Sequence, residues 1–102
     1  MKIYISGRIT GYSLFHALKK FAQTERYLRE HGYDSVVNPT TLHDYSIEQS
    51  WKDYMIVDIK HLFDCDAIFM QSDWSMSKGA RIEYQIAKEL GLKIIFEEEV
   101  PF

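Results

Sequence analysis

The hydrophobic positions of this chain form four short runs, separated by longer stretches in which apolar residues recur every three or four positions. The runs are rich in β-branched and aromatic residues, which predicts buried strands at 2–6, 34–38, 67–71 and 93–96. The longer stretches predict helices at about 13–31, at 46–63 and from the loop after residue 71 to Leu90. The second helix is expected to begin at a capping box formed by Ser46 and Gln49.

Strands that alternate with helices predict a parallel α/β sheet in a single domain spanning residues 1–102. We expect a flavodoxin- or Rossmann-like three-layer sandwich with four strands in the order 2-1-3-4. Strands one and three are then neighbours whose connections leave on opposite faces, and open α/β sheets bind ligands at such a switch point. The loops 7–11 and 73–79 are expected to meet there.

Two acidic residues fall on helix faces that are otherwise apolar. Glu83 lies at an inward position of the third helix, and Asp58 lies on one face with Met55 and Leu62 in the second. A buried unpaired charge is expensive, so such a carboxylate is usually paired, protonated or open to a ligand pocket. We expect Glu83 to be ionised at neutral pH, because first-turn backbone donors and a hydroxyl such as that of Tyr4 favour the charged form.

Composition narrows the possible functions. Hydrophobic residues make up 46% and charged residues 26%, and the formal net charge is -3 with Lys and Arg dispersed, which argues against a nucleic-acid polymer as partner. No apolar run approaches the roughly 20 residues that cross a bilayer, so no membrane partner is expected. The single cysteine, Cys65, suits a reducing cytoplasm. The four histidines are scattered, so neither a metal site nor a cofactor is expected.

The candidate residues also resemble a known family. The shared pattern consists of Ser6-Gly7 after the first strand, Asp58 ahead of the third, Asp73, and the spacing Ser77-x-Gly79-x-x-x-Glu83. It is similar to the nucleoside 2-deoxyribosyltransferase superfamily, which includes transferases, hydrolases of deoxynucleoside monophosphates, and small phage and bacterial relatives. The resemblance covers nearly the whole chain and is most specific in the first loop and in the Gly79 to Glu83 spacing.

The resemblance implies a reaction at the N-glycosidic bond of a nucleoside or nucleotide. Glu83 would attack C1 of the deoxyribose, release the base and hold the sugar as a covalent ester, which another base or water then takes. Retaining chemistry of this kind needs a second group to manage the proton on the leaving atom. Asp58 and Asp73 are the candidates for that role.

The other candidate site residues surround these three carboxylates. The loop from Ser6 to Gly11 would cradle the sugar or a 5'-phosphate, with Arg8 adding positive charge. Trp74 is a candidate for stacking on the base. The expected substrate-binding set is Tyr4, Ser6, Gly7, Arg8, Ile9, Gly11, Trp74, Ser77 and Gly79.

The chain departs from the family pattern at two points. The related hydrolases carry Ser-Ile-Arg after the glycine, whereas the arginine of Arg8-Ile9-Thr10 stands two positions earlier, which leaves phosphate recognition open. The chain is also shorter than a typical transferase, so a neighbouring subunit is expected to complete the pocket. The apolar helix ending at Phe63 carries more hydrophobic surface than a small sheet covers, which predicts a homodimer or higher homo-oligomer.

Each candidate also has a simpler interpretation. Glu83 becomes a surface residue if the helix phase is misjudged, and Asp58 belongs to an ordinary salt bridge or helix-end arrangement. Gly7 and Gly11 are then turn glycines, and Trp74 packs at a strand end. At the level of function, the alternative to an enzyme is a module that binds a nucleotide or a nucleotide-derived signal without cleaving it.

Overall fold

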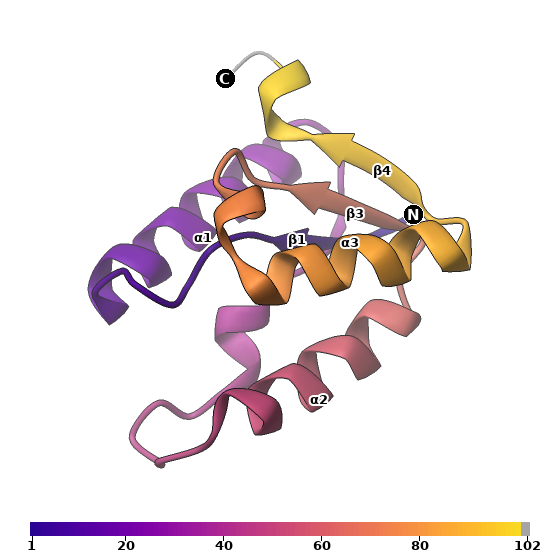
Figure 1. The fold of residues 1–102 in the computed structure, drawn as a ribbon. Coiled ribbons are helices and arrows are strands. Elements are labelled where there is room, and N and C mark those ends of the chain that lie inside the picture. Colours follow the sequence, from indigo (N-terminus) through magenta and orange to yellow (C-terminus); the bar gives the residue numbers. More distant parts are fainter. Residues whose placement is uncertain (101–102) are drawn as a thin grey trace.

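The computed structural model describes residues 1–100. Its strands form one four-stranded parallel sheet (Figure 1). The strands are β1 (Lys2–Ser6), β2 (Ser35–Val37), β3 (Ala67–Met70) and β4 (Lys93–Phe96), and their order is β2-β1-β3-β4. Tyr4, at the middle of β1, pairs with Val37 on one side and Ile68 on the other. The expected fold class and strand order are therefore confirmed.

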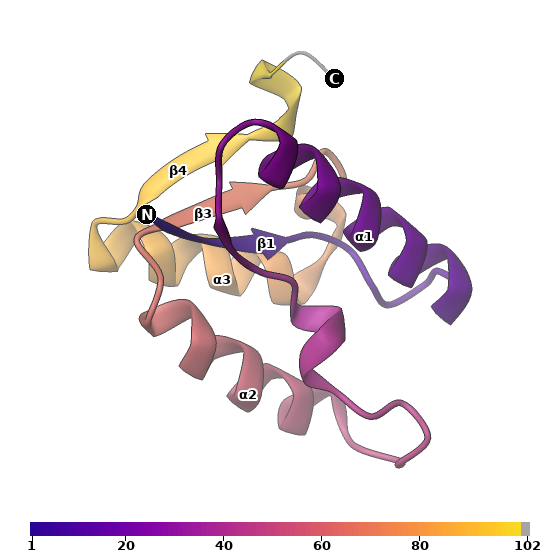
Figure 2. The same cartoon turned by 180° about the vertical axis from the view of Figure 1, so that it is seen from behind.

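Helices cover both faces of the sheet. The first, α1 (Leu14–Glu30), packs on one face, and α2 (Trp51–Phe63) and α3 (Lys78–Leu90) lie together on the other (Figures 1 and 2). Short 3-10 turns occur at Pro39–Leu42, Trp74–Met76 and Glu97–Glu99. Within residues 1–100, no helix combines the length and apolar character needed to cross a membrane.

The central strand β1 divides its side chains between two cores. Ile3 and Ile5 belong to the core under α1, whereas Tyr4 belongs to the core under α2 and α3. Successive residues of a strand point to opposite faces, so Ser6 lies on the same face as Tyr4. Two hydroxyl-bearing side chains therefore reach the α3 side from a strand that is buried on both faces.

The start of α2 differs from the expectation. The capping box is formed by Ser50 and Asp53, with Asp53 N donating to Ser50 Oγ (3.1 Å) and Ser50 N donating to Asp53 Oδ2 (3.2 Å). Ser46 instead donates from N and Oγ to Asp44 Oδ1, at 3.0 and 2.6 Å, in a local turn. The prediction of a cap at Ser46 was wrong because Ser46 is satisfied within its own turn, where it cannot start a helix.

Candidate functional site

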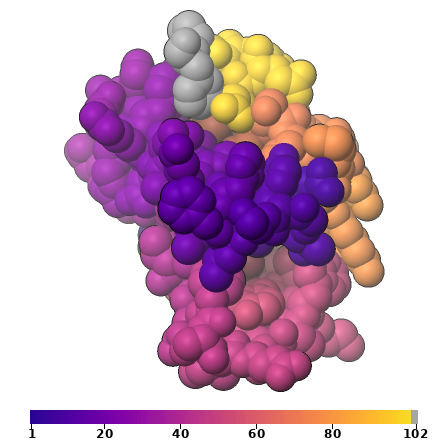
Figure 3. Space-filling model, turned by 90° about the vertical axis from the view of Figure 1, so that its left-hand side faces the viewer, coloured from indigo at the N-terminus to yellow at the C-terminus, as the bar shows by residue number. Residues whose placement is uncertain are grey.

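A cavity of about 410 Å³ opens at the carboxyl ends of β1 and β3, between the loop after β1, the start of α2 and the start of α3. Figure 3 looks at this side of the molecule, where the indigo segment after β1 lies above the magenta segment leading into α2. The cavity lining contains seven of the residues predicted above to form the site: Tyr4, Gly7, Ile9, Asp58, Ser77, Gly79 and Glu83. The expected meeting of the two loops at the switch point is confirmed by a hydrogen bond from Arg8 N to Asp73 Oδ1 (3.1 Å).

Glu83 is held at the inner wall of this cavity by two hydroxyls from β1. The side chain is buried, with only 5% of the residue exposed, as its position on the inner face of α3 predicts. Tyr4 Oη donates to Glu83 Oε2 (2.6 Å), and Ser6 Oγ donates to Oε1 (2.7 Å). Both carboxyl oxygens are therefore oriented by a rigid central strand.

The ionisation of Glu83 departs from the expectation. Burial raises its pKa to about 8, against the opposing effect of the hydrogen bonds from Tyr4 and Ser6, and the nearby charge of Asp58 adds to the rise. The hydroxyl contacts were correctly anticipated, but they do not outweigh desolvation. In the ligand-free protein, Glu83 is therefore mostly protonated at neutral pH, and the prediction of an ionised carboxylate was wrong.

Asp58 faces the same cavity from α2. It is buried, and its Oδ1 lies 2.7 Å from His43 Nε2, in a pair whose two side chains are both almost fully enclosed. Burial raises the pKa of Asp58 to about 7, with His61 opposing, and burial lowers the pKa of His43. Both shifts have one main cause, the loss of solvent around a charge, and both favour the uncharged forms of the two side chains.

Asp73 takes part in a different arrangement. Its carboxylate accepts from Arg8 N (3.1 Å), Tyr12 Oη (2.9 Å) and Lys20 Nζ (2.5 Å), and it is absent from the cavity lining. Burial alone would raise the pKa of Asp73, but these hydrogen bonds together lower it below the ordinary value. Lys20 Nζ also donates to Arg8 O (2.7 Å). Asp73 therefore fastens the loop after β1 to the loop after β3.

Arg8 and Gly11 form a compact turn outside the cavity lining. Arg8 Nε donates to Thr10 O (3.0 Å), and its guanidinium lies 5.0 Å from the centre of the Tyr12 ring. Gly11 has a φ of 98°, and a Cβ at this position would collide with the Arg8 guanidinium. Gly11 is therefore required by the turn, and Arg8 is directed along the surface of its own loop.

Three other predicted residues have clear structural positions. Trp74 packs against Tyr84 and Phe96, with ring centres 4.9 and 5.9 Å away, and does not line the cavity. Ser77 lines it and caps α3, accepting from the N–H of Ala80 (3.1 Å). A Cβ on Gly79 would come within 3.0 Å of a Met55 sulfur, so the glycine lets α3 approach α2 closely at the cavity wall.

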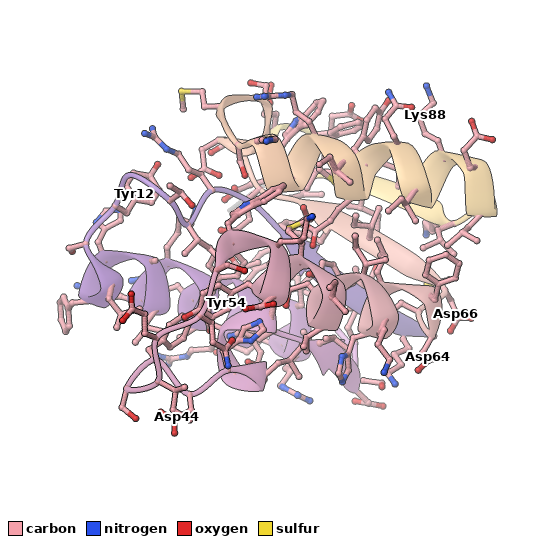
Figure 4. All side chains as sticks on the ribbon, turned by 60° about the horizontal axis from the view of Figure 1, so that its bottom comes forward. Tyr12, Asp44, Tyr54, Asp64, Asp66 and Lys88 are labelled. Atoms are coloured by element: carbon pink, nitrogen blue, oxygen red, sulfur yellow. The ribbon has the colours of Figure 1, made fainter. Side chains whose placement is uncertain are left out.

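The sequence interpretation missed an aromatic wall on the side of the cavity opposite β1. Tyr45 and Tyr54 stack with ring centres 5.8 Å apart, and His43 meets Tyr54 edge-on at 4.8 Å. These three residues and Trp51 all line the cavity. In Figure 4, Tyr54 and Tyr12 lie toward the same end of the molecule, far from Lys88. The density of aromatic residues between positions 43 and 54 was the available signal.

Metal binding finds no support in the described residues. Within residues 1–100, no three His, Cys, Asp or Glu side chains gather closely enough to hold a metal ion. His43 is committed to Asp58, and His61 Nδ1 lies 3.0 Å from the carbonyl oxygen of Val57. The cavity lining supplies two buried carboxyls, one imidazole and the hydroxyls of Tyr4, Thr10, Tyr12, Tyr45, Tyr54 and Ser77.

Comparison with known proteins identifies a family without identifying an activity. No curated protein and no solved structure gives a match to the chain. Residues 1–96 match the model of a family described as a domain of unknown function, DUF4406. The matched residues include both loops and all the cavity-lining residues. The chain therefore belongs to the DUF4406 family.

Proposed function

We propose that this protein cleaves or transfers the N-glycosidic bond of a nucleoside through a covalent intermediate on Glu83. The observation that carries the proposal is a buried glutamate that faces a cavity, with each carboxyl oxygen held by a hydroxyl of the central strand. A second buried carboxyl, Asp58, lies on the same cavity. A nucleophile and a separate proton donor are the two groups that a retaining glycosidic reaction requires.

The proposed reaction has two steps, formation and breakdown of the sugar ester on Glu83. Ionised Glu83 attacks C1 of the sugar, the C1–N bond breaks, and Asp58 gives its proton to the leaving base. In the second step Asp58 takes a proton from water or from a new base, which attacks C1 and frees Glu83. Positive charge develops at C1 as the C1–N bond breaks, so it stabilises the Glu83 carboxylate in the transition state, and the molecules that react are those in which Glu83 has already lost its proton to solvent.

The charges around the cavity favour a nucleoside over a nucleotide. The lining contains two carboxyls and no Lys or Arg among the described residues. Three cations stand nearby but are engaged: Arg8 with Thr10 and Tyr12, Lys20 with Asp73, and Lys78 over the Trp51 ring at 4.6 Å. A phosphate in the cavity would meet no free cation among the described residues, and its negative charge would oppose the ionisation of Glu83 that the proposed reaction needs. The aromatic wall suits a planar base.

Non-catalytic binding remains the second candidate, and one observation favours it. Because the pKa of Glu83 is raised to about 8, its protonated carboxyl can donate a hydrogen bond to a ligand at neutral pH. A module that holds a nucleoside or a nucleotide-derived signal would use the same cavity without forming the covalent ester. Turnover is therefore the property that separates the two candidates.

The decisive experiment incubates the protein with 2'-deoxynucleosides, ribonucleosides and the corresponding 5'-monophosphates and measures released base by chromatography. A different free base is added to half of the reactions. Transfer then produces a nucleoside of the added base, whereas hydrolysis produces only the free sugar and the released base. We expect base release from at least one 2'-deoxynucleoside, slower release from its monophosphate, and none from Glu83→Gln. The matched control is Glu89→Gln, which makes the same change at an exposed position of α3. Saturable binding without release by the wild type would support the binding module.

We also propose that the protein acts as a homodimer through the outer side of α2. Ile56 and Phe63 are each 56% exposed there, an unusual amount of apolar surface for a short helix. Light scattering should report a dimer at micromolar concentration, and Ile56→Glu should shift it to a monomer, whereas Lys19→Glu, at an exposed position of α1 on the other face of the sheet, should not. A monomeric wild type at high micromolar concentration would rule this out.

A cytoplasmic location remains a prediction, based on the free and buried Cys65.

A further inference from the structure

His43 is the one enclosed imidazole at the cavity, and the two-step reaction described above does not use it. Its Nε2 lies 2.7 Å from Asp58 Oδ1. Tyr54 holds the imidazole edge-on with an interplanar angle of 85°, and Tyr45 lies against it at 65°. The ring therefore has little freedom to turn away from Asp58.

The hydrogen bonds of Asp58 leave one oxygen available. His43 occupies Oδ1, whereas Oδ2 takes part in no hydrogen bond among residues 1–100 and is not one of the fully buried polar atoms that lack a partner, so it keeps some exposure. Because Asp58 lines the cavity, Oδ2 is the atom that meets a bound ligand. A carboxyl that is fixed at one oxygen and free at the other is oriented to pass a proton in one direction.

We propose that His43 is a positioning residue for the reaction at this site: by donating from Nε2 to Oδ1 it fixes the Asp58 carboxyl with its proton on Oδ2, the oxygen that delivers this proton to the leaving base. This inference rests on the proposed function. When the base departs with that proton, the pair is left with one negative charge. The attacking water or base restores the proton in the second step, so the pair returns to its starting state.

The charges that surround the pair explain why a histidine is useful here. The charge of Asp58 acts on Glu83 from α3, on Tyr4 from β1 and on Tyr45 from the segment before α2, and His61 of its own helix acts on Asp58. A protonated Asp58 beside a neutral His43 carries no net charge. In the form that reacts, Asp58 keeps its proton and Glu83 is the single charge of the two carboxyls. Without His43, the two carboxyls would compete for ionisation, as like charges in one site do.

The test uses His43→Phe, which keeps an aromatic ring but removes the hydrogen bond, and His43→Gln, which keeps a donor. The matched control is His31→Phe at the far end of α1, where the side chain is exposed. Each protein is assayed with 2'-deoxyguanosine and with 7-methyl-2'-deoxyguanosine, whose cationic base leaves without needing a proton. Thermal unfolding and the titration of the Asp58 carboxyl, followed by carbon NMR, are measured on the same samples.

We expect His43→Phe to lose at least tenfold in kcat on 2'-deoxyguanosine and less than threefold on the methylated substrate, with partial rescue in His43→Gln. Equal losses on both substrates would mean a general structural role and overturn the proposal. In the titration, wild-type Asp58 should report two coupled steps and His43→Phe a single step at higher pH. Identical titrations would overturn the coupling between His43 and Asp58. If the wild type releases base from none of the 2'-deoxynucleosides, the proposed function fails with the positioning role, while the titration still decides whether the two side chains are coupled.

Discussion

Two carboxylate sites lie at the same edge of the sheet and differ in almost every physical respect. Asp73 accepts three hydrogen bonds, one of them from a lysine, and its pKa is lowered. Glu83 accepts only from neutral hydroxyls, has no cation beside it, and its pKa is raised to about 8. Sequence analysis assigned both to catalysis, yet only Glu83 lines the cavity.

The difference shows how to separate a structural acid from a chemical one. A carboxylate saturated with donors is held in one charge state over the whole physiological range, so it fastens two loops well but exchanges no proton. A buried carboxyl with few donors changes charge readily when a ligand arrives. Two carboxyl side chains at one sheet edge therefore differ in charge behaviour, according to the donors that the surrounding strand, helix and loops supply.

The largest expected effect separates the two sites by activity. Glu83→Gln should reduce turnover by roughly a thousandfold or more, because it removes the nucleophile, whereas Asp73→Asn should reduce it by less than about tenfold. Base release measured by chromatography, with circular dichroism to confirm folding, gives the result. A folded Asp73→Asn protein that is as inactive as Glu83→Gln would break the comparison.

For the free energy of unfolding, we expect a substitution at Asp73 to have the larger effect. Asp73→Ala leaves Lys20, Tyr12 and the N–H of Arg8 without their acceptor, which should cost about 2 to 4 kcal/mol. Urea unfolding measures the change in free energy. As a control, Glu30→Ala, which breaks an exposed ion pair with Arg26, should stay within about 0.5 kcal/mol. A cost for Asp73→Ala no larger than the control's would mean that the two loops are joined by other contacts.

The two sites should also give opposite dependences of stability on pH. The folded-state pKa of Glu83 is above its unfolded value, so its contribution is full below about pH 4.5 and declines as the pH rises toward about 8. The slope is at most about 1.4 kcal/mol per pH unit. Asp73 has a lowered pKa, so its contribution is lost only as the pH falls below its ordinary range. Urea unfolding from pH 4 to pH 9 should show the alkaline decline shrink in Glu83→Gln, and an unchanged decline would contradict the assignment.

The smallest effect concerns the hydroxyls that orient Glu83. Tyr4→Phe removes the donor to Oε2, which should raise the Glu83 pKa further and lower kcat/KM at neutral pH by about tenfold, with partial recovery at higher pH. Tyr84→Phe removes a hydroxyl outside the cavity lining and should leave the rate unchanged. A pH profile of both variants gives the answer, and a Tyr4→Phe profile that matches the wild type would detach the hydroxyl from the mechanism.

The fold was predictable because it depends on local patterns. Apolar runs with turn residues between them predicted all four strands and their order, and the inward phase of Glu83 and Asp58 followed from helical spacing. Helical spacing would place Leu14 and Leu90 on the inner faces of α1 and α3, but both are exposed, at the ends of these helices. The cavity was less predictable. The His43–Asp58 contact joins a loop to a helix 15 residues later, and no periodicity records such a contact.

Charge states were the least predictable feature. The sequence indicated which hydroxyl would reach Glu83, but the balance between those donors and desolvation depends on how completely the cavity wall excludes water. For Asp73, the sequence placed an acid after β3 without indicating that Lys20 would reach it from α1, 53 positions away. Arg8 was expected to meet a phosphate, and its engagement by Thr10 and Tyr12 depends on a turn conformation that the sequence does not specify.

The hydrogen bond from Tyr4 to Glu83 spans 79 positions of the chain and has a consequence for biosynthesis. A ribosome releases β1 and β2 early, but β3, which must fill the other side of β1, follows only after α2. Until residues 67–70 emerge, the nascent chain presents an unpaired edge of β1, a state prone to association with other chains. Glu83 arrives later still, with α3, so a stalled chain that ends before Lys78 carries the aromatic wall of the cavity but lacks the carboxyl that Tyr4 and Ser6 hold.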